Sequence, residues 1–575
     1  MRPAFFFRAP AIIPNDAHRL DRTAASFYAS GSPVPAAARH YADNAPDMDY
    51  DWHLPYPSRR QPIFARNAVA TSQPLATQAG IAMLVKGGNA VDAALATAIT
   101  LTLVEPCSNG LGSDLFAILW TGSELVGLNA SGRAPQAWTP ARFAGRTAMH
   151  ERGWETVTIP GAVSGWRALS QRFGTVPFAD LFEPAIRYAR DGFLVSPIVA
   201  EKWALAVPHM PRDLGWFEHF MPRGRAPHPG ERFASPAMAA TLEKIARTDG
   251  EAFYRGELAD AMVRHARSAG AAHTLADFAA HTNDWVAPLG LDYRDSTVHE
   301  IPPNGQGIAA LMALGILENF DLRAMPPDSA ATQHLEIEAM KLAFADAHRY
   351  VSDPRTMPVP ASALLDRAYL AARARKINPA HAQVFGPGEP PKGGTVYLCA
   401  ADKNGMMVSL IQSNYMGFGA GVVVPGTGIS LQNRGTGFSL RPGHPNEVAG
   451  GKRPYHTIIP GFVTRNGAPL AAFGVMGGPI QPPGHVQTLV RLIDYRMNPQ
   501  AVLDAPRWKV NAGRSIDLEA SAPPELRAGL QAMGHTMASV PDSYMDFGAG
   551  QFIVRTDDGY IAASDPRRDG QAAGF

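Results

Sequence analysis

Residues 393–438 read GGTVYLCAADKNGMMVSLIQSNYMGFGAGVVVPGTGISLQNRGTGF, and the character of the chain changes where they begin. The preceding residues 380–394 (AHAQVFGPGEPPKGG) are rich in proline and glycine, which is typical of a flexible linker. TVYLCAA then predicts a strand, Asp402 to Gly405 a turn, and MMVSLIQS the second strand of a hairpin. The sequence therefore places Thr395 where a loop meets a strand.

Thr395 is a candidate nucleophile because of this position. Gly393 and Gly394 permit unusual backbone angles and leave the Gly394 carbonyl open to attack by the threonine hydroxyl. A freed Thr395 would carry both a nucleophilic hydroxyl and an α-amine, whose pKa of about 7.7–8.0 suits a general base. A threonine after two glycines is most often only a strand residue, so this hypothesis depends on the rest of the chain.

Upstream of the linker, the pattern is mainly helical. PLATQAGIAMLVKGG (74–88) and NAVDAALATAITLTLVEP (89–106) predict two helices, the second largely buried and ended by Pro106. LFAILW (115–120) predicts a strand, and helices are expected to dominate from about 160 to 350. Residues 1–47 lack periodicity and predict a loose extension, with ordered chain from Met48. Whether residues 1–47 belong to the native protein stays open at this point.

Composition excludes several classes of protein. The chain has 575 residues, of which 46% are hydrophobic and 18% charged, as in a globular protein with a large core. A net charge of +1 without a long basic run argues against a nucleic-acid partner. No apolar stretch reaches the ~18 residues of a membrane span, and the N-terminus is a poor secretion signal. We therefore expect a cytoplasmic location, with the periplasm as the alternative, and no membrane partner.

Motifs for cofactors and metals are also missing from the sequence. The glycine-rich stretch GFGAGVVVPGTG (417–428) runs into strand and proline, whereas a dinucleotide-binding loop should open a helix. There is no G-x-S-x-G elbow and no H-E-x-x-H, and His334 lies in what reads as ordinary helix. Two cysteines make no disulfide framework, and Cys399 is expected to be a buried thiol. We predict neither a cofactor nor a metal.

The stretch 393–438 resembles the start of the small subunit of γ-glutamyltransferases (γ-glutamyltranspeptidases), a family of N-terminal-nucleophile hydrolases. In that family a catalytic threonine opens a strand and is followed by an Asp-x-x-Gly turn and a Phe-Gly-x-Gly segment. The positions that match here are Thr395, Asp402, Gly405, Phe418, Gly419 and Asn433. Further matches occur in order at 66–96, 157–166, 174–193, 301–322, 498–508 and 563–575, so the resemblance spans 66–575 in register.

The resemblance implies an α+β fold, a four-layer αββα sandwich with two central sheets and helices outside. It implies that the precursor cuts itself between Gly394 and Thr395 into a large subunit (48–394) and a small subunit (395–575) that build one fold. The two subunits would stay together as a heterodimer, alone or as a dimer of heterodimers. The implied activity is cleavage of small γ-glutamyl or glutaryl-type amides through an acyl ester on Thr395, with transfer to water or an amine. The alternative is a non-catalytic homologue that acts as a binding or scaffold protein.

The resemblance also assigns residues around the nucleophile. Gly477 and Gly478 fall where the family has two backbone N–H donors to the oxyanion, each typically worth about 3 kcal/mol in acyl transfer. Ser413 stands where the family has a second threonine that hydrogen-bonds the nucleophile, and it keeps the hydroxyl group.

The expected substrate pocket departs from the family pattern. Tyr415 (or Asn414, by a one-residue shift), Arg434 and Gly437 replace residues that hold the α-amino end of glutamate. His456 and Thr457 replace two serines, and Arg133 is the nearest equivalent of the substrate arginine, displaced by two positions. Loss of a carboxylate at 437 and gain of Arg434 favour an acyl group with a terminal carboxylate and no α-amine, such as glutaryl. This pattern is most similar to the acylase-like branch of the family.

Overall fold

The structure is a computed structural model that describes residues 59–385, 394–540 and 547–575, all within the compact unit formed by 57–575. The predicted N-terminal extension, the predicted order from Met48 to residue 58, and linker residues 386–393 lie outside the described residues. No helix among the described residues has the length and apolar character needed to cross a bilayer.

Two large antiparallel sheets form the centre of the described chain. Sheet I has the strand order β21-β2-β10-β11-β3-β4-β7, and sheet II has the order β1-β20-β19-β15-β14-β9-β8. The strands of sheet I are β2 (Ala68–Thr71), β3 (Asp114–Trp120), β4 (Leu125–Ala130), β7 (Asp284–Val286), β10 (Gly394–Ala401), β11 (Met407–Tyr415) and β21 (Gln571–Gly574). The strands of sheet II are β1 (Ile63–Ala65), β8 (Leu289–Tyr293), β9 (Ser296–Glu300), β14 (Gly461–Arg465), β15 (Ala468–Met476), β19 (Ala549–Arg555) and β20 (Tyr560–Ser564).

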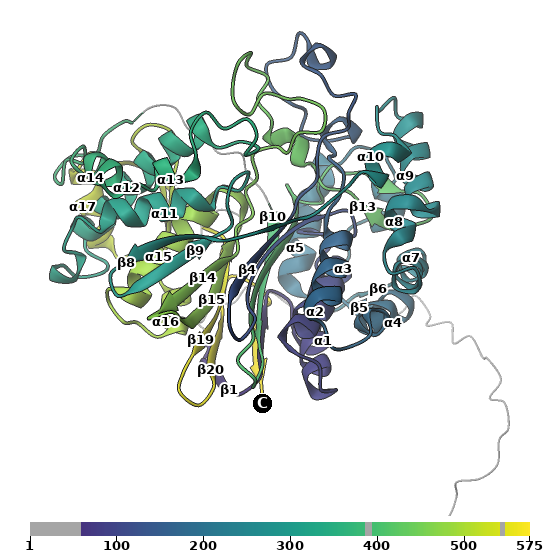
Figure 1. The fold of residues 1–575 in the computed structure, drawn as a ribbon, viewed down its shortest axis with the longest axis horizontal. Coiled ribbons are helices and arrows are strands. Elements are labelled where there is room, and N and C mark those ends of the chain that lie inside the picture. The colour runs from purple at the N-terminus through teal and green to yellow at the C-terminus, as the bar shows by residue number, and fades with distance from the viewer. Residues whose placement is uncertain (1–58, 386–393, 541–546) are drawn as a thin grey trace, which may run out of the picture. The chain divides into compact units, whose positions relative to one another are not determined.

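Helices cover the outer face of each sheet (Figure 1). A core that includes Phe116, Tyr397 and Phe462 fills the space between the sheets. Two further cores lie between the sheets and the helices, one behind sheet I with α1 (Pro74–Val85), α2 (Ala90–Val104) and α3 (Ala162–Phe173), the other behind sheet II with α11 (Gly307–Leu317), α12 (Ala330–Tyr350) and α15 (Gln481–Ile493). The predicted α+β fold with two central sheets between helices is confirmed.

Smaller elements complete the described residues. The other α-helices are α4 (Glu183–Asp191), α5 (Pro197–Ala206), α6 (Trp216–Phe220), α7 (Pro236–Arg247), α8 (Glu251–Arg255), α9 (Glu257–Ser268), α10 (Leu275–Ala279), α13 (Ala361–Leu364), α14 (Arg367–Ala374), α16 (Pro499–Asp504) and α17 (Pro524–Ala532). Short strands pair outside the two main sheets: β5 (Phe193–Leu194) with β6 (Arg232–Phe233), β12 (Val423–Val424) with β13 (Ile429–Ser430), and β17 (Ser515–Glu519) with both β16 (Trp508–Val510) and β18 (Thr536–Val540).

Local chemistry explains why the central helix and hairpin form where they do. Asn89 caps α2 in a capping box with Asp92, and every residue of α2 is buried. The Asp402 carboxylate at the hairpin turn accepts a hydrogen bond from the Ala90 N–H (2.9 Å), which also belongs to the first turn of α2. The turn between β10 and β11 is thereby fixed to the helix that packs behind sheet I.

The hairpin is regular except at its open end. Pairing runs from Val396 opposite Gln412 to Ala401 opposite Met407, with an irregularity between Gly394 and Val396. Thr395 lies at this irregularity, and Tyr415 opposite Gly394 has a φ of 78°. Irregular pairing of this kind turns a side chain away from the direction that a regular strand would give it.

Candidate active site

The Thr395 side chain is fully buried at the start of β10, and a second hydroxyl lies beside it. Thr395 Oγ1 is 3.2 Å from Ser413 Oγ on the neighbouring strand β11. Ser413 Oγ in turn accepts a hydrogen bond from the Tyr415 N–H (2.7 Å). The structure thus brings together two of the residues that the sequence proposed for catalysis.

A glycine turn follows β15, a strand of the opposite sheet. The pairing of β15 ends at Met476, so the N–H groups of Gly477 and Gly478 lie past the ladder. Both glycines have positive φ, 131° and 70°. A Cβ on Gly477 would lie 2.9 Å from the Gly548 Cα, so the close approach of two backbones requires glycine here.

Gln306 holds this turn, and sequence reasoning did not identify it as a site residue. Its Nε2 donates to the carbonyl oxygens of Gly478 (2.9 Å) and Thr457 (2.7 Å). Gln306 lies within the quoted match at 301–322, but nothing in that motif indicated that its side chain reaches the glycine turn.

Gln481 was also missed, and it connects the glycine turn to Thr395. It is the first residue of α15 and is fully buried. Its Nε2 donates to Thr395 Oγ1 (3.4 Å), and its Oε1 accepts from the Ile459 N–H (2.9 Å). The hydroxyl from sheet I and the glycine turn from sheet II are therefore parts of one site between the sheets.

Arg434 is buried with part of its guanidinium unpaired. Its Nη1 donates to Thr457 Oγ1 (2.8 Å), and the guanidinium carbon lies 4.6 Å from the centre of the Tyr415 ring. Nε and Nη2 have no hydrogen-bond partner among the described residues. Burial lowers the pKa of Arg434 to about 10, so the group stays charged at neutral pH. A buried cation with free donors is costly unless an anion binds there.

His456 points to a carboxylate that the sequence did not single out. Its Nε2 lies 3.1 Å from Asp114 Oδ2, and its Nδ1 accepts from the Ile458 N–H (3.4 Å), so Nε2 carries the proton. Burial raises the pKa of Asp114 to about 7, although the nearby charge of Arg434 acts in the opposite direction. Burial also lowers the pKa of His456 well below its usual value. His456 therefore stands as a neutral donor to Asp114.

Two predicted substrate residues are engaged elsewhere. The Asn414 amide bonds Ser113 and Ser430 (2.9 and 3.1 Å), and it forms no described hydrogen bond with Thr395. Arg133 is 27% exposed and pairs with Asp353 (3.5 Å) and Asp284 (3.6 Å). Neither contact speaks for or against a role with bound substrate, so both assignments stay predictions.

A cavity of about 160 Å³ lies next to the residues that contact Arg434. Tyr415 and Thr457, both in contact with Arg434, line it together with Pro479 of the glycine turn. The other lining residues are Gln306, His348, Val351, Thr436, Gly437, His444, Asn446 and Tyr455. No aspartate or glutamate is among the described lining residues. The cavity can accommodate a small acyl group, and two of its lining residues contact the Arg434 cation.

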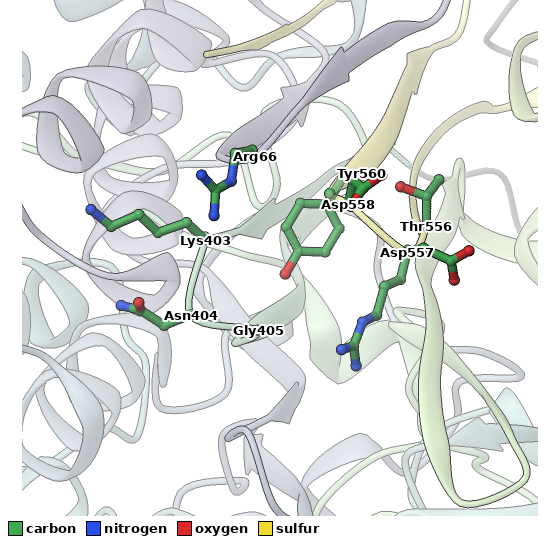
Figure 2. A pocket seen from close by; sticks show the side chains of 10 residues that line it. Arg66, Lys403, Asn404, Gly405, Thr556, Asp557, Asp558 and Tyr560 are labelled. Atoms are coloured by element: carbon green, nitrogen blue, oxygen red, sulfur yellow. The ribbon is translucent and has the colours of Figure 1, made fainter.

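A larger cavity of about 500 Å³ lies beyond the far end of β10, which is roughly 20 Å along the strand from Thr395. Figure 2 shows the Tyr560 ring there between Lys403 on one side and Asp557 on the other. Its lining mixes cations and carboxylates, and the Tyr560 hydroxyl already donates to the Asp402 carbonyl (2.8 Å). This arrangement resembles a solvated turn region more than a catalytic site.

One group of described residues has the types and spacing to hold a metal ion, namely His334, Glu338 and His535. The two imidazoles are hydrogen-bonded to each other (2.8 Å), and Glu338 pairs with Lys341 (2.7 Å). The existing hydrogen bonds and the adjacent ammonium group make this cluster a poor cation site.

Comparison with known proteins identifies the family. A sequence profile described as Gamma-glutamyltranspeptidase matches residues 76–575. The chain belongs to the gamma-glutamyltranspeptidase family. It is 35% identical to the glutathione hydrolase-like YwrD proenzyme of Bacillus subtilis over 525 residues, covering 89% of this chain and 99% of the relative. It is 36% identical to the oxamate amidohydrolase proenzyme of Klebsiella pneumoniae over 516 residues, covering 87% and 97%.

A solved structure agrees with this membership. The crystal structure of cephalosporin acylase from Bacillus halodurans is 47% identical, covers 92% of this chain and 99% of its own, and superposes with a TM-score of 0.88. The predicted family and enzyme class are confirmed: the chain is an amidohydrolase proenzyme of the gamma-glutamyltranspeptidase family.

Proposed function

We propose that Thr395 is the N-terminal nucleophile of this enzyme and that the precursor frees it by cutting its own Gly394–Thr395 bond. The observation that carries this proposal is the buried Thr395 hydroxyl, which contacts Ser413 and also Gln481, the residue that follows the glycine turn of the opposite sheet. The two products would be residues 1–394, which contain the large subunit 48–394, and the small subunit 395–575, and they would remain one folded heterodimer.

Thr395 would take part in two reactions. In maturation, Thr395 Oγ1 attacks the Gly394 carbonyl carbon, the C–N bond breaks, and water hydrolyses the resulting ester. In catalysis, the same oxygen attacks a substrate amide while the new α-amine takes the hydroxyl proton and delivers it to the leaving amine. The N–H groups of Gly477 and Gly478 would stabilise the oxyanion. Water or an amine then removes the acyl group.

The proposed substrates are small amides with a carboxylate on the acyl side, of the glutaryl or γ-glutamyl type, and the pocket is expected to prefer glutaryl, which has no α-amine. Support comes from Arg434, whose Nε and Nη2 are unpaired and whose contacts Tyr415 and Thr457 line the cavity. The described lining also lacks an acidic residue, which would be needed to bind an ammonium group. Tyr415, Thr457 and His456 would shape the pocket around Arg434. The names of two relatives refer to glutathione and to oxamate. Both molecules are amides that carry a carboxylate, which agrees with the proposal.

Intact mass of the purified protein beside Thr395→Ala tests the nucleophile. We expect two wild-type fragments that end at Gly394 and begin at Thr395, and a single uncut variant chain. An uncut wild-type chain that forms no acyl-enzyme would overturn the proposal and favour a scaffold role. Hydrolysis of glutaryl and γ-glutamyl anilides then tests the pocket, since a clear preference for γ-glutamyl would contradict the preference for an acyl group without an α-amine.

A further inference from the structure

We propose that Gln481 is a catalytic residue that donates a hydrogen bond to Thr395 Oγ1 and stabilises this oxygen when it leaves the acyl-enzyme. The inference rests on the proposed function of Thr395. It assigns a task that neither the hydroxyl pair nor the glycine turn performs, namely support for the bridging oxygen of the ester.

The orientation of the Gln481 amide is set by the backbone. Its Oε1 accepts the Ile459 N–H at 2.9 Å, which turns Nε2 toward Thr395 Oγ1 at 3.4 Å. An amide nitrogen can only donate, so Thr395 Oγ1 is the acceptor in this contact. The proton of the Thr395 hydroxyl is therefore directed away from Gln481 and is available to Ser413 or to the α-amine.

The position of Gln481 in the chain couples it to the oxyanion donors. It follows Gly477-Gly478-Pro479-Ile480 directly and begins α15. The turn that carries the two proposed oxyanion donors therefore also fixes the start of the helix whose first residue directs its amide at Thr395 Oγ1. A helix-borne, fully buried group of this kind needs little reorganisation during the reaction.

The chemistry predicts which step depends on the contact. In the acyl-enzyme, water attacks the ester carbonyl carbon and gives a proton to the Thr395 α-amine. The tetrahedral intermediate then breaks its bond to Oγ1, which takes the electron pair and recovers the proton from the ammonium group. Negative charge grows on Oγ1 in this second step, and the Gln481 N–H stabilises it. During acylation the same donor withdraws electron density from the attacking oxygen, so its loss should slow ester breakdown more than ester formation.

Gln481→Met removes the donor and keeps the length of the side chain. Gln487→Met is the matched control, because Gln487 is a buried glutamine of the same helix that bonds the Pro483 and Trp508 carbonyls and not Thr395. With a glutaryl anilide, Gln481→Met should show a burst of aniline, about tenfold lower kcat, a lower KM, and an acyl adduct on the 395–575 fragment. Gln487→Met should show none of these changes relative to wild type.

Several outcomes would overturn the inference. If Gln481→Met cuts itself and hydrolyses its acyl-enzyme as fast as wild type does, Gln481 is only structural. The same conclusion follows if Gln487→Met gives the same burst of aniline as Gln481→Met. If Gln481→Met stays uncut, hydroxylamine decides: fragments released at residue 394 support a stalled ester, and a resistant chain contradicts it. Wild type that neither matures nor acquires an adduct would instead refute the proposed role of Thr395.

Gln481→Glu gives an independent readout. A carboxyl group donates to Thr395 Oγ1 only when it is protonated, so the rate of ester breakdown in this variant should fall as pH rises. The rate in Gln481→Met should show no such fall. A flat pH profile for Gln481→Glu, equal to that of Gln481→Met, would contradict the role as donor.

Discussion

Replacing Arg434 with methionine should separate recognition of the acyl carboxylate from catalysis. Arg434 offers two unpaired donors, Nε and Nη2, in a buried position. A hydrogen bond to a charged group contributes about 1.5–3 kcal/mol, so two of them give at least about 3 kcal/mol. Since 1.36 kcal/mol is a factor of ten, kcat/KM for a glutaryl anilide should fall by at least about 100-fold. Methionine keeps an unbranched side chain next to the Tyr415 ring, which limits structural damage.

The assay compares glutaryl anilide with valeryl anilide, which has the same chain length and no carboxylate. Wild type should prefer the glutaryl substrate, and Arg434→Met should lose that preference while it retains valeryl activity and cuts at residue 394 as before. Arg434→Lys keeps the charge without the planar donor pair, so it should fall between the two. An equal loss on both substrates would show that Arg434 supports the fold of the site, and no loss on either would refute carboxylate binding.

Three further predictions concern the groups around Arg434 and Thr395. Gly477→Ala should lower kcat by about 10²–10³-fold, because the Cβ would displace the turn that holds the proposed oxyanion donors. Gly467→Ala, at a positive φ with open space around it, should leave kcat near wild type in the same steady-state assay. Ser413→Ala should slow self-cleavage, followed by fragment mass over time, while Ser413→Thr, which keeps the hydroxyl, should mature; equal rates for both would remove Ser413 from the mechanism. KM for glutaryl anilide should rise as pH increases through about 7, because Asp114 then becomes negatively charged near Arg434 and weakens the attraction of Arg434 for the substrate carboxylate. Asp114→Asn should abolish this rise. A wild-type KM that does not change with pH would contradict the proposed binding of the substrate carboxylate by Arg434.

Local signals predicted individual elements well, whereas the two-sheet fold was predicted from the family resemblance. The capped helix that ends before Gly87 and the hairpin around Asp402 depend on neighbouring residues, and both form as expected. The contact of Thr395 with Ser413 follows from the same hairpin, since they lie on adjacent strands.

The missed residues make contacts between distant parts of the chain. Gln481 meets Thr395 across 86 positions, and Asp114 meets His456 across 342. No local pattern marks such pairs, since a glutamine at a helix start and an aspartate at a strand start are ordinary residues there. The unpaired edge of Arg434 was likewise invisible, because its burial depends on Tyr415, Thr457 and the packing of both sheets.

The strand order has a consequence for the lifetime of the enzyme. In sheet I, β10 from the C-terminal side of the proposed cut pairs with β2 and β11 pairs with β3, both from the N-terminal side; in sheet II, β14 pairs with β9 in the same way. A cut at residue 394 would therefore leave two interleaved polypeptides. Refolding from denaturant, a first-order process for the uncut chain, would become a bimolecular encounter whose rate falls with dilution. Maturation would thus make folding a one-time event, and the mature enzyme would depend on slow unfolding for its persistence.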